Sequence, residues 1–352
     1  MKDTIDGTAL VYCNKMFNTL EGKTAHGLVR FTERFDVLGI IDEIHAGKDA
    51  GEVLDNKPNG IPIFKSFEAA IKKVSAKNFV VGLAPDGGRL PAEDKEVVRK
   101  AIRKGMNITS GLHDILTRDE KLVRLAKKHD CTIKDVRKTP DRDELHFFTG
   151  KIEEVDCLKI AVLGTDSAIG KRTSAWIIVH GFRKAGLKAA MVGTGQTAWM
   201  QGAKYSMIMD SCINDFVSGE IEHATHEAWK NEQPDLIVIE GQGSLMNPAY
   251  PGGFEILAAG RPDYVVLQHA PKRLEYDGFP GYTLHPLPEQ IRAIEVISGK
   301  KVIAITVNHE GMEDDEIIPA CEKITKETGL PAFDVLAHGP EGLVDVLKTM
   351  LK

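Results

Sequence analysis

The chain has 352 residues, which is enough for two domains of ordinary size. Its formal net charge is −6, and its acidic and basic residues are interspersed, so it lacks the basic stripe of a nucleic-acid-binding protein. Five scattered cysteines without a CxxC pair argue against a disulfide framework or a zinc site. No apolar run reaches the roughly 18 residues that span a bilayer, and no apolar signal segment opens the sequence. We therefore expect no membrane association and a cytoplasmic location.

Short apolar runs alternate with amphipathic stretches, which is typical of a parallel sheet flanked by helices. In the first part of the chain this pattern predicts strands at 9–13, 36–42, 78–83, 106–110 and 131–136, with helices at 24–31, 67–74, 92–104 and 118–129. The second of these strands ends in Asp42, as the second strand of a Rossmann unit does. No GxGxxG motif follows the first strand, so the sequence gives little support for a dinucleotide site.

A polar stretch at residues 138–156 interrupts this alternation, and we expect a linker at 141–156. Beyond it the pattern predicts strands at 158–163, 189–193, 236–240, 264–268, 302–306 and 332–335, with helices at 171–185, 214–230, 288–298, 314–328 and 341–351. The sequence thus predicts an α/β protein of two domains. A Rossmann-like parallel sheet would occupy residues 1–140, and a P-loop NTPase-like parallel sheet would occupy residues 157–352.

The strongest motif is GTDSAIGKRT at residues 164–173, which lies between a predicted apolar strand and a predicted helix. That context is the one a phosphate-binding P-loop requires, because glycines let backbone N–H groups turn toward an anion at a helix N-terminus. The loop is one residue longer than GxxxxGK[ST], and Arg172 takes the usual hydroxyl position. We expect cofactor binding by Gly164, Thr165, Asp166, Ser167, Ala168, Ile169, Gly170, Lys171, Arg172 and Thr173. Among these, Lys171 would reach the terminal phosphates, and Thr173 offers the best hydroxyl for Mg²⁺.

The P-loop spelling resembles that of dethiobiotin synthetase, GTDTxVGKT. The strand that ends in EGQG at 240–243 is similar to that family's acidic strand end, VEGAGG. By this resemblance Glu240 would hold Mg²⁺ beside Thr173, on the strand next to the P-loop. The loop at 242–253 departs from the synthetase pattern, so the resemblance covers only the nucleotide-binding core.

Other polar residues follow predicted strands at the edge where open α/β sheets bind ligands. Gln196 and Thr197 lie in a glycine-rich turn and are candidates for ligand contacts. Asp215 is a candidate base or metal ligand, although its place at a helix start also suits a cap. His269 follows a strand and could act as a base near neutral pH, although it could equally be a solvated loop residue. Glu240 completes the predicted catalytic set.

Considered along its whole length, the chain resembles a bacterial and archaeal family labelled as a domain of unknown function. The resemblance is carried by GKTAHG at 22–27, APDGG at 84–88, GLHD at 111–114, the P-loop, GTGQT at 193–197, DFVSG at 215–219 and EGQG at 240–243. It spans nearly all of residues 8–340. It implies a Rossmann-like N-terminal domain, a P-loop C-terminal domain and N-acetylation of a D-amino acid, D-glutamate in particular, with acetyl-CoA.

Three functions therefore remain open at this point. The family resemblance favours an acetyl-CoA-dependent D-amino-acid N-acetyltransferase, in which the P-loop holds phosphate groups of acetyl-CoA. The P-loop and Glu240 taken alone favour an ATP- and Mg²⁺-dependent kinase or ligase. A nucleotide-binding regulator is the third. In each case we expect a small-molecule partner rather than nucleic acid or membrane, and the sequence leaves open whether the chain forms a homo-oligomer.

Overall fold

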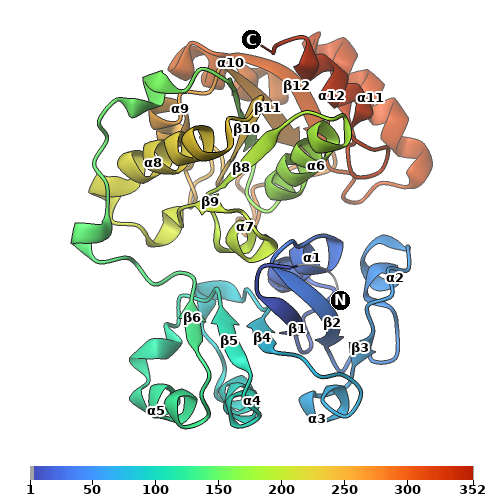
Figure 1. The fold of residues 1–352 in the computed structure, drawn as a ribbon. Coiled ribbons are helices and arrows are strands. Elements are labelled where there is room, and N and C mark those ends of the chain that lie inside the picture. Colours follow the sequence, from blue (N-terminus) through green and yellow to red (C-terminus); the bar gives the residue numbers. More distant parts are fainter. Residues whose placement is uncertain (1–3, 352) are drawn as a thin grey trace. The chain divides into compact units, whose positions relative to one another are not determined.

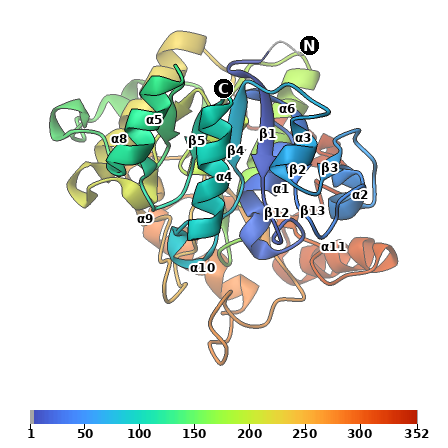
Figure 2. The ribbon, with the colours of Figure 1, turned by 90° about the horizontal axis from the view of Figure 1, so that it is seen from below.

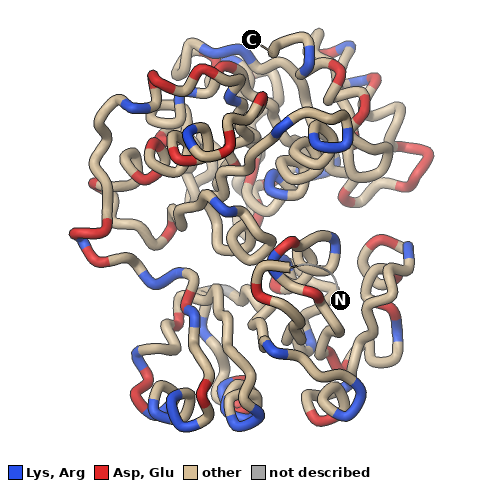
Figure 3. The backbone as a smooth tube through the Cα atoms, in the orientation of Figure 1, with Lys and Arg blue, Asp and Glu red and all other residues tan. Residues whose placement is uncertain are grey.

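The computed structural model describes residues 4–351. Residue contacts divide the chain into two units. The first unit contains the residues up to Thr139 together with Gln196–Gly202, and the second contains Pro140–Gly195 and the residues from Ala203 onward. Lysines and arginines alternate with acidic residues along the tube within each unit (Figure 3). Across residues 4–351, no helix combines the length and the apolar character that a membrane crossing needs.

The first unit is built on a six-stranded sheet in the order β3-β2-β1-β4-β5-β6, in which every pairing is parallel. Its strands are β1 (Gly7–Tyr12), β2 (Phe35–Ile41), β3 (Ile63–Phe64), β4 (Asn78–Val81), β5 (Asn107–Ser110) and β6 (Ile133–Asp135). The strand order reverses direction between β1 and β4. Since crossovers between parallel strands are right-handed, this reversal places the helices of the two halves on opposite faces of the sheet.

The helices of this unit begin and end where local chemistry favours it. They are α1 (Lys23–Arg30), α2 (Ala50–Asp55), α3 (Phe67–Ala70), α4 (Ala92–Arg103) and α5 (Glu120–Lys128). The carboxylate of Asp49 caps α2, and the carboxylate of Asp119 caps α5, each by accepting two backbone N–H groups. In α4 the apolar residues Val98, Ala101 and Ile102 recur at helical spacing and are fully buried. Figure 2 shows α4 and α5 side by side.

The second unit is built on a seven-stranded parallel sheet in the order β13-β12-β11-β7-β10-β8-β9. Its strands are β7 (Leu158–Gly164), β8 (Ala189–Gly193), β9 (Tyr205–Ser206), β10 (Leu236–Glu240), β11 (Tyr264–His269), β12 (Lys301–Val307) and β13 (Ala332–Phe333). All seven residues of β7 are buried, as expected for a central strand covered on both faces. Its neighbours are β10, where Glu240 pairs with Val162, and β11, where Gln268 pairs with Gly164.

Helices cover both faces of this second sheet (Figure 1). They are α6 (Lys171–Lys184), α8 (Asn214–Glu232), α9 (Phe254–Ala259), α10 (Leu287–Ser298), α11 (Asp314–Thr328) and α12 (Glu341–Lys348). Helix α12 packs on α6, where a Cβ on Gly181 would lie 2.7 Å from the side chain of Val344. Helix α8 packs on α9. The predicted fold class, two parallel α/β sheets, is confirmed.

One helix departs from the predicted division of the chain. The sequence prediction placed residues 196–202 in the second domain and put Gln196 and Thr197 in a turn, whereas the structure forms α7 (Gln196–Gln201) there and groups it with the first unit. The side-chain amide of Gln201 donates to the carbonyls of Gly27 and Phe31 at the end of α1, at 2.9 and 3.0 Å. This long-range capping of α1 explains the grouping.

The segment expected to be a linker is packed rather than extended. The structure assigns residues 140–156 to the second unit, with two short 3₁₀ turns in them. The carboxylate of Glu222 on α8 accepts hydrogen bonds from the backbone N–H of Thr149 at 2.6 Å and of Ile152 at 3.2 Å. Ile152 is 1% exposed and joins the hydrophobic core of this unit. The boundary between the two units therefore falls at Thr139.

The acidic end of β2 differs in function from its counterpart in a dinucleotide-binding Rossmann domain. The carboxylate of Asp42 is fully buried and accepts the backbone N–H of Lys15 at 2.6 Å. It also accepts the backbone N–H of His45 at 3.0 Å and contacts the ring Nδ1 of the same histidine at 2.6 Å. These contacts engage both oxygens of a carboxylate that is 0% exposed, so Asp42 organises its own loop and is not accessible to a ribose hydroxyl.

Candidate cofactor-binding site

The P-loop connects the end of β7 to the start of α6, as the sequence predicts. Its backbone turns through two left-handed positions, Ala168 at φ +51° and Gly170 at φ +96°. Gly170 precedes the first residue of α6 and carries no side chain that would be strained there. At Gly164 an added Cβ would lie 2.8 Å from Cδ of Lys171, so only glycine lets the lysine side chain cross the loop.

Lys171 is buried and held in a defined position. Its Nζ donates to the backbone carbonyl of Asp166 at 2.6 Å and to that of Gly243 at 2.7 Å. The ammonium group therefore lies inside the loop, between the carboxyl ends of β7 and β10. A charge fixed in this way needs little reorganisation to meet an anion.

Backbone N–H groups at the start of α6 add to this positive potential. The first helical hydrogen bond runs from the N–H of Ser174 to the carbonyl of Gly170. Among residues 4–351, the N–H groups of Gly170 and Thr173 find no acceptor. Unused donors at a helix N-terminus are a ready anion site, so these residues fit a phosphate or diphosphate group.

A buried carboxylate organises the loop from within. Asp166 is fully buried, and its Oδ1 accepts from Nδ2 of Asn247 at 2.8 Å. Its Oδ2 accepts from the guanidinium of Arg273 and from the backbone N–H of Asp277, both at 2.9 Å. Arg273 also donates to the carbonyl of Ser167 at 2.8 Å. The segment 270–286, between β11 and α10, is thereby fastened onto the P-loop.

Amide side chains at the ends of β11 and β12 support the other side of the loop. Nδ2 of Asn308 donates to the carbonyl of Ile169 at 2.9 Å. Oε1 of Gln268 accepts from the hydroxyls of Ser174 and Thr306. A Cβ on Gly170 would lie 3.8 Å from Nδ2 of Asn308, so this glycine faces the amide groups.

The predicted base His269 lies against the P-loop. Its Nδ1 is 3.1 Å from the hydroxyl of the fully buried Thr165. Burial lowers the pKa of His269 to about 4. The imidazole is therefore neutral at physiological pH and keeps one ring nitrogen able to accept a proton.

The predicted metal ligand Glu240 is engaged by the backbone of the neighbouring strand. One carboxylate oxygen accepts the N–H of Thr194 at 2.8 Å and that of Gly195 at 3.0 Å. Burial raises the pKa of Glu240, although the nearby charges of Arg172 and Lys171 and these two N–H groups oppose the rise. The charges of Lys171 and Arg172 at the start of α6 thus act on Glu240, and its hydrogen bonds fix the turn after β8.

Thr173, the second predicted metal ligand, lies in the first turn of α6 and is half-buried. Across the part of the chain that the structure describes, its hydroxyl makes no hydrogen bond, and no group of three or more His, Cys, Asp and Glu side chains gathers in a metal-binding arrangement. The pairing of Thr173 with Glu240 around Mg²⁺ stays a prediction.

Three further predicted residues lie elsewhere. Asp215 is exposed in the first turn of α8, where its charge favours the helix dipole. Gln196 and Thr197 are buried in α7, and the hydroxyl of Thr197 is 3.1 Å from that of Thr24 in α1. The structure therefore joins Thr197 to the first unit, and ligand contacts by Gln196 and Thr197 stay a prediction.

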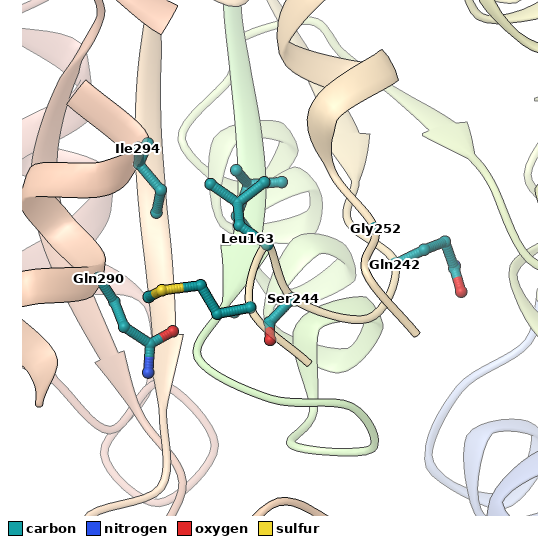
Figure 4. A pocket seen from close by; sticks show the side chains of 9 residues that line it. Leu163, Gln242, Ser244, Gly252, Gln290 and Ile294 are labelled. Carbon is teal, nitrogen blue, oxygen red and sulfur yellow. The ribbon is translucent and has the colours of Figure 1, made fainter. Parts of the chain in front are cut away.

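A small pocket lies beside the end of β7 (Figure 4). Its volume is about 10 Å³, which is enough for one water molecule and too little for a cofactor. The hydroxyl of Ser244 lines it and, within residues 4–351, has no hydrogen-bond partner. Gln242 points away from Gln290 and Ile294, and its Nε2 donates to the hydroxyl of Thr194 at 3.0 Å. The pocket is thus part of the packing behind the P-loop.

Sequence reasoning missed the side chains that support the loop. Asn247, Arg273, Asp277 and Asn308 were not among the predicted site residues. Asn308 directly follows β12 and so lies at the carboxyl edge of the sheet, which is a usable signal. Asn247 and Asp277 lie inside long loops, and no periodic pattern marks them.

Comparison with known proteins identifies the family and several relatives of the chain. A family model described as "Domain of unknown function (DUF1611_C) P-loop domain" matches residues 146–344, and one described as "Domain of unknown function (DUF1611_N) Rossmann-like domain" matches residues 43–139. A crystal structure of a DUF1611 family protein from Anabaena variabilis ATCC 29413 is similar at a TM-score of 0.90 with 28% identity, over 97% of this chain and 99% of that chain.

Two curated relatives bear the same name, D-glutamate N-acetyltransferase. The protein from Pseudoalteromonas sp is 30% identical over 279 residues, which cover 77% of this chain and 81% of the relative. The protein from Tritonibacter scottomollicae is 31% identical over 287 residues, which cover 78% of this chain and 82% of the relative.

Proposed function

The chain belongs to the DUF1611 family, with its Rossmann-like and P-loop domains, and from this premise we propose that it transfers an acetyl group from acetyl-CoA to the amino group of a D-amino acid such as D-glutamate. The names of the two curated relatives support the reaction and the substrate class. The neutral His269 beside the P-loop is the structural observation that carries the proposal, because amine acetylation needs a base close to the bound cofactor.

The phosphate groups of CoA suit the loop. The fixed ammonium of Lys171 and the N–H groups of Gly170 and Thr173 provide charge and donors for a diphosphate. No phosphoryl transfer is needed for this role, and acetyl-CoA would supply only its acetyl thioester. The buried network around Asp166 fixes the shape of the loop, so the cradle is preorganised.

His269 would take the proton of the substrate amine. In the tautomer with the proton on Nδ1, the ring donates to the hydroxyl of Thr165, and Nε2 holds the free lone pair. A pKa of about 4 leaves Nε2 unprotonated throughout the neutral range, and it makes the ring a weaker base than one whose pKa lies near 7. Thr165 then acts as a positioning residue that fixes the ring beside the bound cofactor.

Glu240 has a structural part in this account. Its carboxylate accepts the N–H groups of Thr194 and Gly195 and so fixes the turn after β8. In the proposed reaction Glu240 therefore acts through the backbone that it orders.

The alternative is an ATP- and Mg²⁺-dependent kinase or ligase similar to dethiobiotin synthetase. The observation that favours it is the hydroxyl of Thr173 in the first turn of α6, which makes no hydrogen bond to the residues described. In a P-loop NTPase the hydroxyl at the start of this helix holds Mg²⁺.

Calorimetric titration of the intact protein separates the two functions. We expect acetyl-CoA and CoA to bind without added metal, and we expect ATP to bind no more tightly with Mg²⁺ than without it. Tight binding of ATP that depends on Mg²⁺, with no heat from acetyl-CoA, would replace the acetyltransferase with the kinase or ligase. If ATP binds and no substrate is turned over, the remaining function is that of a nucleotide-binding regulator.

A further inference from the structure

The first unit carries a hollow of about 560 Å³ that the proposed reaction does not use. It lies where β1, β4 and β5 begin, beside β6, and Trp199 of α7 forms one of its walls. Ligands of Rossmann-like sheets usually bind at the opposite, carboxyl ends of the strands, so this hollow is a separate feature. Its volume lies in the range of about 300–1,000 Å³ that is typical of small-molecule sites.

The charge of the hollow is strongly biased. Arg34, Lys77 and Lys134 line it, and its one acidic residue is Asp6, so three positive charges face one negative charge. Arg34 already pairs with Asp6 at 3.1 Å. Among residues 4–351, Lys77 and Lys134 form no ion pair. Two cations thus remain without a counter-charge in one concave surface, which favours an anionic ligand.

Neutral donors accompany these cations. Thr109 is 6% exposed, it lines the hollow, and its hydroxyl makes no hydrogen bond to any residue described. The side-chain oxygen of Asn107 accepts from the N–H and the hydroxyl of Thr132, at 2.9 and 3.0 Å, so the Nδ2 group of Asn107 is left to donate. Both groups line the hollow and are available to donate to a ligand oxygen.

The wall opposite these donors is fixed. The guanidinium carbon of Arg34 lies 3.8 Å from the ring centroid of Trp199, and its Nε donates to the backbone carbonyl of the same tryptophan at 2.8 Å. Nζ of Lys134 lies 5.6 Å from that ring centroid. Both contacts limit the motion of the cations, so less entropy is lost when they bind an anion.

We propose that this hollow binds a small organic dianion, which presents either two carboxylates or one phosphate group to Lys77, Lys134 and the donors of Asn107 and Thr109. Two unpaired cations match a charge of −2, and charge-assisted hydrogen bonds would replace water on both lysines. A ligand with an ammonium group would find no open carboxylate there, because Asp6 is paired with Arg34. The site therefore selects dianions over amino acids of the same length.

Isothermal calorimetry tests this with glutarate as the dicarboxylate and glycerol phosphate as the phosphate monoester. The double variant Lys77→Gln/Lys134→Gln removes both unpaired charges, and Lys65→Gln is the matched control, an exposed lysine of the same unit that does not line the hollow. We expect saturable binding of at least one probe, weakened about tenfold or more in the double variant and unchanged in the control. Binding of glutarate would identify the ligand as a dicarboxylate, and binding of glycerol phosphate would identify it as a phosphate monoester.

The variant Lys171→Ala excludes the P-loop as the site of that binding. We expect it to bind the probe as tightly as the original protein does. The proposal is overturned if neither probe binds, if the double variant binds like the original protein, or if Lys171→Ala abolishes the signal. Acetyl transfer is not the readout, so this result is independent of the proposed reaction.

Discussion

The hydroxyl of Thr165 lies 3.1 Å from Nδ1 of His269, which joins the second residue of the P-loop to the last residue of β11. The two strands are neighbours in the sheet, and the backbone N–H of Thr165 also donates to the carbonyl of Gln268. A side chain able to accept a proton is thus held next to the anion cradle by both backbone and side-chain contacts. In the proposed reaction, this contact would place the base beside the bound cofactor.

The stability of the protein should fall in acid because of His269. Burial lowers its pKa to about 4, whereas an unfolded histidine titrates near 6.5. Between these values the unfolded state binds more protons, so the free energy of unfolding decreases as the pH falls from about 6.5 to about 4. His269→Gln should remove on the order of 3 kcal/mol of this loss, measured by urea unfolding across that range.

His180 provides the matched control for this change. It lies on α6, and burial, followed by the charge of Arg183, lowers its pKa to about 4 as well. His180→Gln should flatten the pH dependence of stability in the same window while acetyl transfer continues. His269→Gln should lower kcat by about 10² to 10⁴ if it removes the base. Equal activity in both variants would exclude His269 as the base.

Replacing Lys171 with alanine should weaken cofactor binding strongly and leave the fold intact. Each charge-assisted hydrogen bond lost to the phosphate groups is worth about 1.5–3 kcal/mol, which corresponds to a loss of affinity of roughly tenfold to a hundredfold. Titration with acetyl-CoA measures the loss, and circular dichroism checks the fold. Lys184→Ala on the same helix, where the side chain is 79% exposed, should bind normally. Unchanged affinity in Lys171→Ala would remove the P-loop from the mechanism.

Asp166→Asn should destabilise the second unit strongly. The carboxylate is fully buried and accepts hydrogen bonds from donors only, including the guanidinium of Arg273, so an amide NH₂ would face another donor and leave Arg273 paired with Glu310 alone. Breaking a buried pair in this way costs about 3–5 kcal/mol. The exposed pair of Lys348 and Asp345 is the control, and Asp345→Asn should change the unfolding free energy by less than about 0.5 kcal/mol. A similar small change in Asp166→Asn would show that the network does not hold the loop.

Glu240→Gln distinguishes the two catalytic accounts. A single oxygen accepts both backbone N–H groups, so the amide oxygen of glutamine can replace it and keep the turn after β8. We therefore expect acetyl transfer to remain within about tenfold of the original rate and to be insensitive to EDTA. If Glu240 is a charged metal ligand, the same change should cost about a hundredfold or more. Steady-state rates with and without EDTA decide between them.

Local patterns were enough to predict most of the fold. Each predicted strand of the second unit appears, because residues such as those of β7 form continuous apolar runs with turn residues at both ends. Helix α7 was missed, because it has only six residues and five of them are buried, so it shows no amphipathic period. Its membership of the first unit depends on Gln201 capping α1 from more than 170 positions away, which no local pattern contains.

The candidate site was predictable only where its residues are consecutive. The P-loop was found because a strand, a glycine-bearing loop and a helix start occur in order. The side chains that shape it come from 81, 107 and 139 positions away, namely Asn247, Arg273 and Asn308. Conversely, Asp215 occupies a suitable sequence position but is exposed at the start of α8. Strand-end placement identifies candidates, and tertiary contacts decide among them.

The most direct test of the proposed reaction is a thiol-release assay with paired D- and L-amino acids. Purified protein should release free CoA thiol from acetyl-CoA when D-glutamate is present and stay at background with L-glutamate, and His269→Gln should suppress the signal by about 10² or more. Mass spectrometry of the product should show one added acetyl group on the amine. The acetyltransferase account would be contradicted by background thiol release with both enantiomers, together with conversion of ATP to ADP in the presence of Mg²⁺.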